Sequence, residues 1–223
     1  MFSKYTHCIV SFVILLYQVN AYCQNENNSS LNGLGISFGA GLSKSNHIES
    51  NLLPGISIGI NSNFLLIDGL FGVVELSYNT RKESFVDLKN YHYTNTGIVG
   101  QNIKLTKNYG LLDLKSYVFK EFYQLKRIGL FGFSGVGFNT LFWYGTKIES
   151  ANFEPISNGA TQTTNTNPIT RPSVSFGPAI KLPFDKDKTM LIKLEYILDF
   201  NLSKKHLSYP NFKSFFFKSS IIF

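Results

Sequence analysis

Apolar residues recur at every second position over most of this chain, which is the period of a β-strand with two unlike faces. In residues 34–42 every even position is apolar and every odd position is Gly or Ser. This pattern, rich in Gly and aromatic residues, argues against disorder and against a helical array. Eight segments show the alternation, at residues 34–42, 56–61, 74–79, 112–118, 128–144, 174–182, 190–201 and 215–223. We therefore expect an all-β chain of eight strands.

The connections between these segments alternate in length. The long ones are rich in Asn, Ser, Thr and Lys, and they lie near residues 43–51, 81–106, 147–172 and 202–211. The tight ones lie near 66–69, 121–126 and 185–188, and the first contains the hairpin signal Asp68-Gly69. Outer-membrane barrels have this asymmetry, with long loops outside the cell and short turns in the periplasm. The spacing predicts an eight-stranded antiparallel up-and-down transmembrane β-barrel.

Period two alone does not say which face meets lipid, because a soluble ligand-carrying barrel would hide the apolar set. Only 16% of residues are charged, against about 25% in ordinary soluble domains. The polar face is crowded with Gly and Ser, whereas a water-facing strand surface carries more Lys, Glu and Thr. The apolar face is therefore expected to meet lipid. The aromatic residues expected at the membrane interfaces are Tyr78, Trp143, Tyr144, Tyr196 and Tyr209.

The first 23 residues have the layout of a secretory signal peptide. Lys4 precedes an apolar run at residues 9–17, and small residues follow. The run is about half the 20 or so residues that a membrane-crossing helix needs, so a retained helix is the weaker alternative. Export is the expected fate of the chain.

Cleavage after Ala21 and cleavage after Cys23 both remain open. A lipoprotein anchor at Cys23 is disfavoured because Tyr22, a large residue, precedes it. Cleavage after Cys23 leaves no cysteine in the mature chain. The expected division is a signal peptide at 1–23, a polar leader at 24–30 and a barrel domain at 31–223.

Several short motifs occur in a recognisable order along the chain. They are GLGIS at 33–37, VELSYN at 74–79, NYGLLDL at 108–114, FSGVGF at 133–138, FGPAIK at 176–181 and LEY at 194–196. Together they resemble the PorT-like outer-membrane β-barrel family, which is common in Bacteroidetes. The resemblance runs from about Leu31 to Phe223 and implies location in a bacterial outer membrane. It also suggests, as an alternative role, membership of a secretion or gliding apparatus.

The C-terminus adds a second resemblance. Apolar residues at alternate positions before the terminal Phe, interrupted by Ser219, are similar to the signature that the barrel-assembly machinery recognises. The candidate assembly signal consists of Phe215, Phe217, Ile221 and Phe223.

The alternation places charged residues in the lumen. An eight-stranded barrel is only wide enough for side chains to fill, and unpaired buried charge is costly, so these charges are expected to pair and close the lumen. A narrow gated path lined by the same charges is the functional alternative. The candidate lumen network consists of Glu75, Asp113, Lys115, Lys181, Lys193, Glu195, Asp199 and Lys218.

No sequence signal points to catalysis, a metal or a cofactor. The only histidines after the signal peptide are His47, His92 and His206, in or near expected loops, with Ser45 and Ser208 close by. There is no nucleophile elbow and no HExxH or paired-Cys motif, so no catalytic residue is assigned. A lipid-modifying outer-membrane enzyme is the third alternative, after the secretion apparatus.

The expected partners are membrane lipid, the barrel-assembly machinery and an unidentified protein that binds the external loops. Nucleic acid is not expected, because the pairs Arg81-Lys82 and Lys204-Lys205 suit anionic headgroups equally well and no basic aromatic platform is present. The loop at 152–170 is a candidate for partner contact. We expect a structural or interaction protein of the outer membrane and no open pore.

Overall fold

Strands make up almost all of the part of the chain that the computed structural model describes, residues 32–46, 51–94, 97–150, 162–164, 169–185, 188–200 and 211–223. In chain order the strands are β1 (Gly33–Ser45), β2 (Leu53–Ile67), β3 (Leu70–Thr94), β4 (Gly97–Leu125), β5 (Ile128–Ser150), β6 (Gln162–Thr164), β7 (Ile169–Pro183), β8 (Thr189–Asp199) and β9 (Phe212–Ile222). Within these residues no helix is long and apolar enough to cross a membrane.

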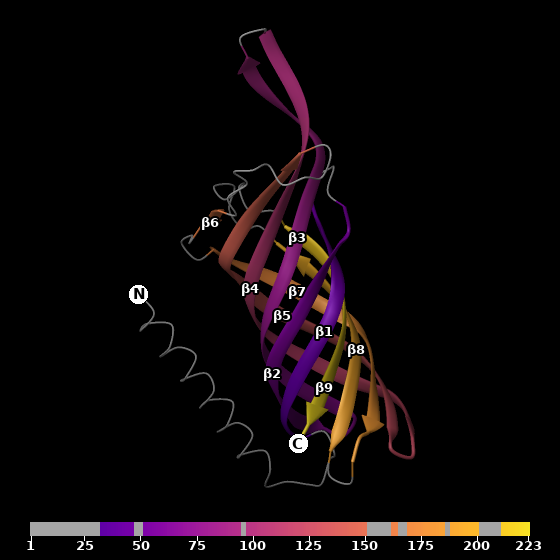
Figure 1. Ribbon diagram of the computed structural model, residues 1–223. Helices are drawn as coiled ribbons and strands as arrows, with labels where there is room; N and C mark the ends of the chain where they lie inside the picture. The colour runs from indigo at the N-terminus through magenta and orange to yellow at the C-terminus, as the bar shows by residue number, and fades with distance from the viewer. Residues whose placement is uncertain are drawn as a thin grey trace.

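Eight of the strands close into an antiparallel barrel (Figure 1). Barrel strands that follow one another in the sequence are paired, and β1 pairs with β9 to close the ring, from Gly35 opposite Ile222 to Ser45 opposite Phe212. The short strand β6 pairs only with β5, so it is an addition at the rim and not a ninth barrel strand. The predicted eight-stranded up-and-down barrel is confirmed.

The three connections predicted to be tight are tight. Asp68-Gly69 joins β2 to β3, and Gly69 has a φ of 71°, a left-handed conformation that glycine adopts without a steric penalty. Lys126-Arg127 joins β4 to β5, with Lys126 at a φ of 54°. The third connection, at 184–188, is closed by backbone hydrogen bonds. All three lie at the end of the barrel where β1 begins and β9 ends (Figure 1).

The prediction of a long connection at 81–106 is wrong. β3 and β4 continue through it as paired strands as far as Thr94 opposite Gly97, and this hairpin stands well beyond the other strands (Figure 1). Arg81 therefore belongs to β3, and it is buried inside the barrel and not at the base of a loop. The polar composition of this segment was misleading because the part of a strand that extends beyond the apolar outer surface of the barrel needs no apolar face.

The two faces of the barrel wall are sharply distinguished. Phe216 is fully buried, whereas the next residue, Phe217, is 51% exposed. Large apolar side chains are exposed on the outside of every barrel strand but β3, with Ile56 60% and Val136 64% exposed, and the outward Leu76 and Tyr78 of β3 are partly exposed. The outward face is thus apolar, as the composition of the inner face predicted.

Several sequence predictions fall on residues outside the described ranges. They are the signal peptide at 1–23, the leader at 24–30, His47, most of the loop at 152–170, Lys204-Lys205, His206, Ser208 and Tyr209.

Candidate functional site: the charged interior

A carboxylate bridges two lysines at mid-height in the barrel. Lys193 of β8 lies directly opposite Lys218 of β9 in the strand ladder, and both side chains point inward. Glu75 of β3, on the far side of the lumen, reaches Lys193 Nζ through Oε2 at 2.6 Å and Lys218 Nζ through Oε1 at 2.7 Å. All three are almost completely buried. Glu75 therefore compensates a like-charge pair that would otherwise be destabilising.

A second carboxylate, that of Glu195, continues the network toward β4. Its Oε1 lies 2.9 Å from Lys115 Nζ and accepts a hydrogen bond of 2.7 Å from the Tyr117 hydroxyl. Its Oε2 lies 2.9 Å from Lys218 Nζ. The Tyr117 ring also supports the neighbouring ammonium of Lys193, which lies 4.0 Å from the ring centroid. Each buried charge here has an opposite charge within contact distance, as buried ions require.

The network extends toward the hairpin end through Asp113. Its Oδ2 lies 3.4 Å from Lys115 Nζ and 3.6 Å from Arg81 Nη2. Arg81 also bonds Asp199, which in turn accepts a hydrogen bond from Asn139. These contacts join Glu75, Asp113, Lys115, Lys193, Glu195, Asp199 and Lys218 into one chain of ion pairs, with Arg81 as the link to Asp199.

Lys181 stands apart from this chain. It is buried on β7, nearer the end with the short turns, and no ion pair to it is found within the described ranges. Lys181 is thus the one predicted lumen charge that does not join the chain of ion pairs.

Two groups of buried apolar residues lie above and below the charges. Along β4 the inward residues run Tyr109 and Leu111, then Asp113 and Lys115, and then Tyr117 with Phe119 beyond it. The cluster at the hairpin end consists of Tyr109, Leu111, Leu141 and Phe212. The cluster at the other end consists of Phe71, Val73, Tyr117, Phe119, Phe131, Phe133, Ala179, Leu191 and Ile222.

Aromatic rings pack closely in the larger cluster. Phe119 and Phe133 stack with centroids 4.9 Å apart, and Tyr117 meets Phe133 edge to face at 5.7 Å. Phe71 meets Phe131 in the same way at 5.7 Å. Such contacts fill the cross-section of a narrow barrel. The ion pairs around Glu75, Lys115 and Glu195 therefore lie between two apolar clusters, which we call the apolar seals. Arg81 lies beside the seal at the hairpin end, opposite Tyr109 in the ladder and 5.5 Å from the Phe212 ring centroid.

Sequence reasoning missed several interior residues. Arg81 and Glu83 continue the odd-numbered inward series of β3 that begins at Glu75, so extending the same period along the strand would have found them. Glu83 accepts hydrogen bonds from Ser45 Oγ at 2.6 Å and from the Tyr109 hydroxyl at 2.9 Å. Ser45, which lies two residues before His47 in the sequence, therefore donates its hydrogen bond to an interior carboxylate of the barrel wall.

The aromatic residues expected at the membrane interfaces divide between the two faces. Trp143 lies outside, where its Nε1 donates a hydrogen bond of 2.9 Å to the Tyr78 hydroxyl. Tyr144 packs against the interior cluster at the hairpin end, so its predicted interface position is wrong. The reason is a bulge: the ladder between β4 and β5 slips between Gly110 and Leu111, which leaves Phe142 as an extra outward residue.

The candidate assembly signal lies on the outer face of β9. Phe215, Phe217 and Phe223 are about half exposed, and Ile221 is partly exposed. Tyr196 of β8 is also on this face, in edge-to-face contact with Phe176 at 5.3 Å. In the described residues no group of His, Cys, Asp and Glu is arranged to hold a metal ion.

Comparison with known proteins gives a fold likeness only. No protein-family model matches the sequence, and no curated protein matches it significantly. A major outer membrane protein from Thermus thermophilus is similar in structure, with a TM-score of 0.50 and 9% identity over 85% of this chain and 98% of that one. Neisserial surface protein A has a TM-score of 0.43 and 11% identity over 88% and 97% of the two chains. Ail of Yersinia pestis has a TM-score of 0.40 and 11% identity over 86% and 100%.

Proposed function

We propose that this chain is a bacterial outer-membrane protein with a closed lumen, which acts by binding partners through its external hairpin. The apolar outer face supports the membrane placement, because a continuous apolar belt in water would drive association. The Thermus barrel shares this fold. A closed barrel resists SDS until heated, so outer-membrane fractions should contain a band whose mobility changes on boiling. A soluble protein with no such shift would refute the placement.

The lengths of the connections indicate the orientation. The three short turns lie at the end where β1 begins and β9 ends, and in outer-membrane barrels the short turns are periplasmic. The hairpin of β3 and β4 then points away from the cell. A cysteine introduced by Thr94→Cys at its tip should react with a membrane-impermeant maleimide on intact cells. Asp68→Cys, in a short turn, should react only after lysis.

The interaction role rests on one observation, the extended β3–β4 hairpin. Its ladder runs from Phe85 opposite Leu105 to Thr94 opposite Gly97, so the projection is a paired ribbon. Beyond Asn79, β3 has no ladder with β2 in the described part of the chain, and its outer edge offers backbone groups that an extended partner segment can pair with. A variant that lacks residues 87–103, closed by Asn-Gly, should keep the heat-dependent gel shift and lose partner binding.

The proposed closed lumen is supported by the buried ion pairs and by the apolar seals on either side of them. In a planar bilayer the refolded protein should give no steady conductance to small ions. Channel-level conductance would contradict this part of the proposal. Membership of a PorT-like secretion or gliding apparatus is the alternative proposal, on the motif resemblance at 33–37 and 74–79. It predicts that deletion of the gene abolishes secretion or gliding while the outer membrane stays intact.

A further inference from the structure

Two lysines face each other on the outside of the barrel. Lys44 of β1 lies directly opposite Lys213 of β9 in the strand ladder, and both are exposed. The next outward pair along the same strands is Leu42 opposite Phe215, which are 45% and 48% exposed. On β1 and β9 the lysine pair therefore lies where the row of outward apolar residues ends, on the side toward the hairpin.

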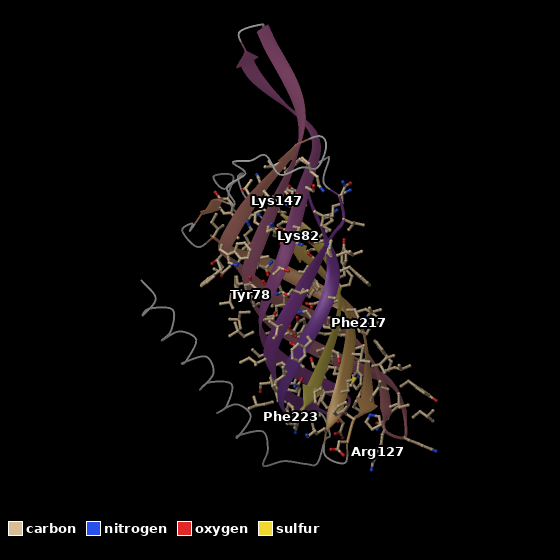
Figure 2. The ribbon with its side chains drawn as sticks, viewed as in Figure 1. Tyr78, Lys82, Arg127, Lys147, Phe217 and Phe223 are labelled. Atoms are coloured by element: carbon tan, nitrogen blue, oxygen red, sulfur yellow. The ribbon has the colours of Figure 1, made fainter. Side chains whose placement is uncertain are left out.

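Within the residues that the structure describes, no negative charge compensates this lysine pair. No carboxylate within those residues makes an ion pair with Lys44 or Lys213. Like charges directly opposite one another on a sheet are destabilising. Lys82 lies at the same end of the barrel, opposite the end that holds Phe223, and adds positive charge there (Figure 2).

The interior shows how this barrel accommodates the same arrangement. Lys193 and Lys218 are also directly opposite on neighbouring strands, one of which is again β9. There the two oxygens of Glu75 bridge the ammonium groups at 2.6 and 2.7 Å. A phosphate likewise presents several anionic oxygens, which two lysines can share. The outer pair thus has the same ladder arrangement as the bridged inner pair, with no bridging carboxylate among the described residues.

We propose that Lys44 and Lys213 together bind the phosphate of an anionic lipid in the outer leaflet. The acyl chains of that lipid lie along Leu42 and Phe215, directly below the phosphate. This inference rests on the proposed membrane placement and orientation. It assigns the barrel a specific lipid position beyond general contact with the bilayer.

The test compares lipid retention by refolded variants in detergent micelles, measured by native mass spectrometry. The probes are diphosphoryl lipid A, which carries accessible phosphates, and phosphatidylcholine, which has no net charge. Wild-type protein should prefer lipid A, and the double variant Lys44→Gln/Lys213→Gln should lose about thirtyfold in lipid A affinity. Phosphatidylcholine retention should not change.

Lys120 provides the matched control, because it is an exposed lysine on β4 near a short turn at the opposite end. Lys120→Gln should retain lipid A as wild type does.

A double variant that shows the normal heat-dependent gel shift and still binds lipid A fully would overturn this inference and leave the membrane placement standing. Displacement of the lipid by equimolar inorganic phosphate would also overturn it, because a free anion would then be the ligand. Absence of the protein from outer-membrane fractions would instead refute the placement.

Discussion

Glu75→Gln should be among the most damaging single substitutions in the barrel. The variant keeps the shape of the side chain and removes the charge that bridges Lys193 and Lys218. Lys218 keeps its contact with Glu195 at 2.9 Å, whereas Lys193 loses the only ion pair that it makes in the described residues. The variant thus leaves an uncompensated buried cation beside another.

The expected loss of unfolding free energy is about 3–5 kcal/mol, the usual result of removing one partner of a buried ion pair. Retained amide contacts to the lysines favour the lower part of this range, and repulsion between the facing lysines favours the upper part. A second variant, Glu75→Gln with Lys193→Met, should recover much of the loss, because it removes the stranded cation and fills the same space with an apolar chain.

Urea unfolding of the refolded protein in lipid vesicles measures these differences. Trp143 is the only tryptophan in the chain and lies on the outer face, so its fluorescence reports insertion. Glu121→Gln is the control, since the Glu121 carboxylate has no ion pair among the described residues, and it should change stability by less than about 1 kcal/mol. If Glu75→Gln unfolds within about 1 kcal/mol of wild type, the carboxylate bridge between the two lysines does not stabilise the fold.

Three further predictions use other parts of the wall. Lys115→Met should stay non-conducting in a planar bilayer, because the apolar seals remain; a steady current would favour an ion-pair gate instead. Gly110→Ala should displace the Trp143 indole, whose Nε1 lies 2.2 Å from the position of an added Cβ, and cost about 1–3 kcal/mol in urea unfolding with a shifted emission maximum; an unchanged spectrum would contradict the close packing. Asp199→Asn should cost less than Glu75→Gln in the same urea assay, since Arg81 keeps its second carboxylate partner; an equal or larger loss would contradict this ranking.

The strand count, the faces and the tight turns were predictable from period two because each depends only on local alternation and turn residues. The same period located the inward charges from Glu75 to Lys218. It could not reveal which charges meet across the lumen, because Glu75 and Lys193 come from strands that are far apart in the sequence. That pairing depends on barrel closure and register.

The other misses have local causes. In β5 the alternation is blurred because inward Phe131 and Phe133 match outward Leu130 and Phe138 in hydrophobicity, so neither face is distinctly polar. The bulge beyond Leu141 then shifts the parity, and a bulge of this kind leaves no clear mark in a sequence that is already apolar on both faces.

The glycines of the inner face bear directly on whether the lumen is open. Small residues along a barrel wall suggest an empty bore, yet here they receive the stems of long side chains from neighbouring strands. A Cβ added to Gly39 would lie 2.6 Å from Lys218 Cγ, and one added to Gly137 would lie 2.6 Å from Lys115 Cγ. Each lysine therefore lies along the wall over a glycine and presents its ammonium to a carboxylate across the lumen. The inner glycines and the lysine side chains therefore pack together and fill the lumen with ion pairs, and in the described part of the chain the outer face and the hairpin remain as surfaces for binding.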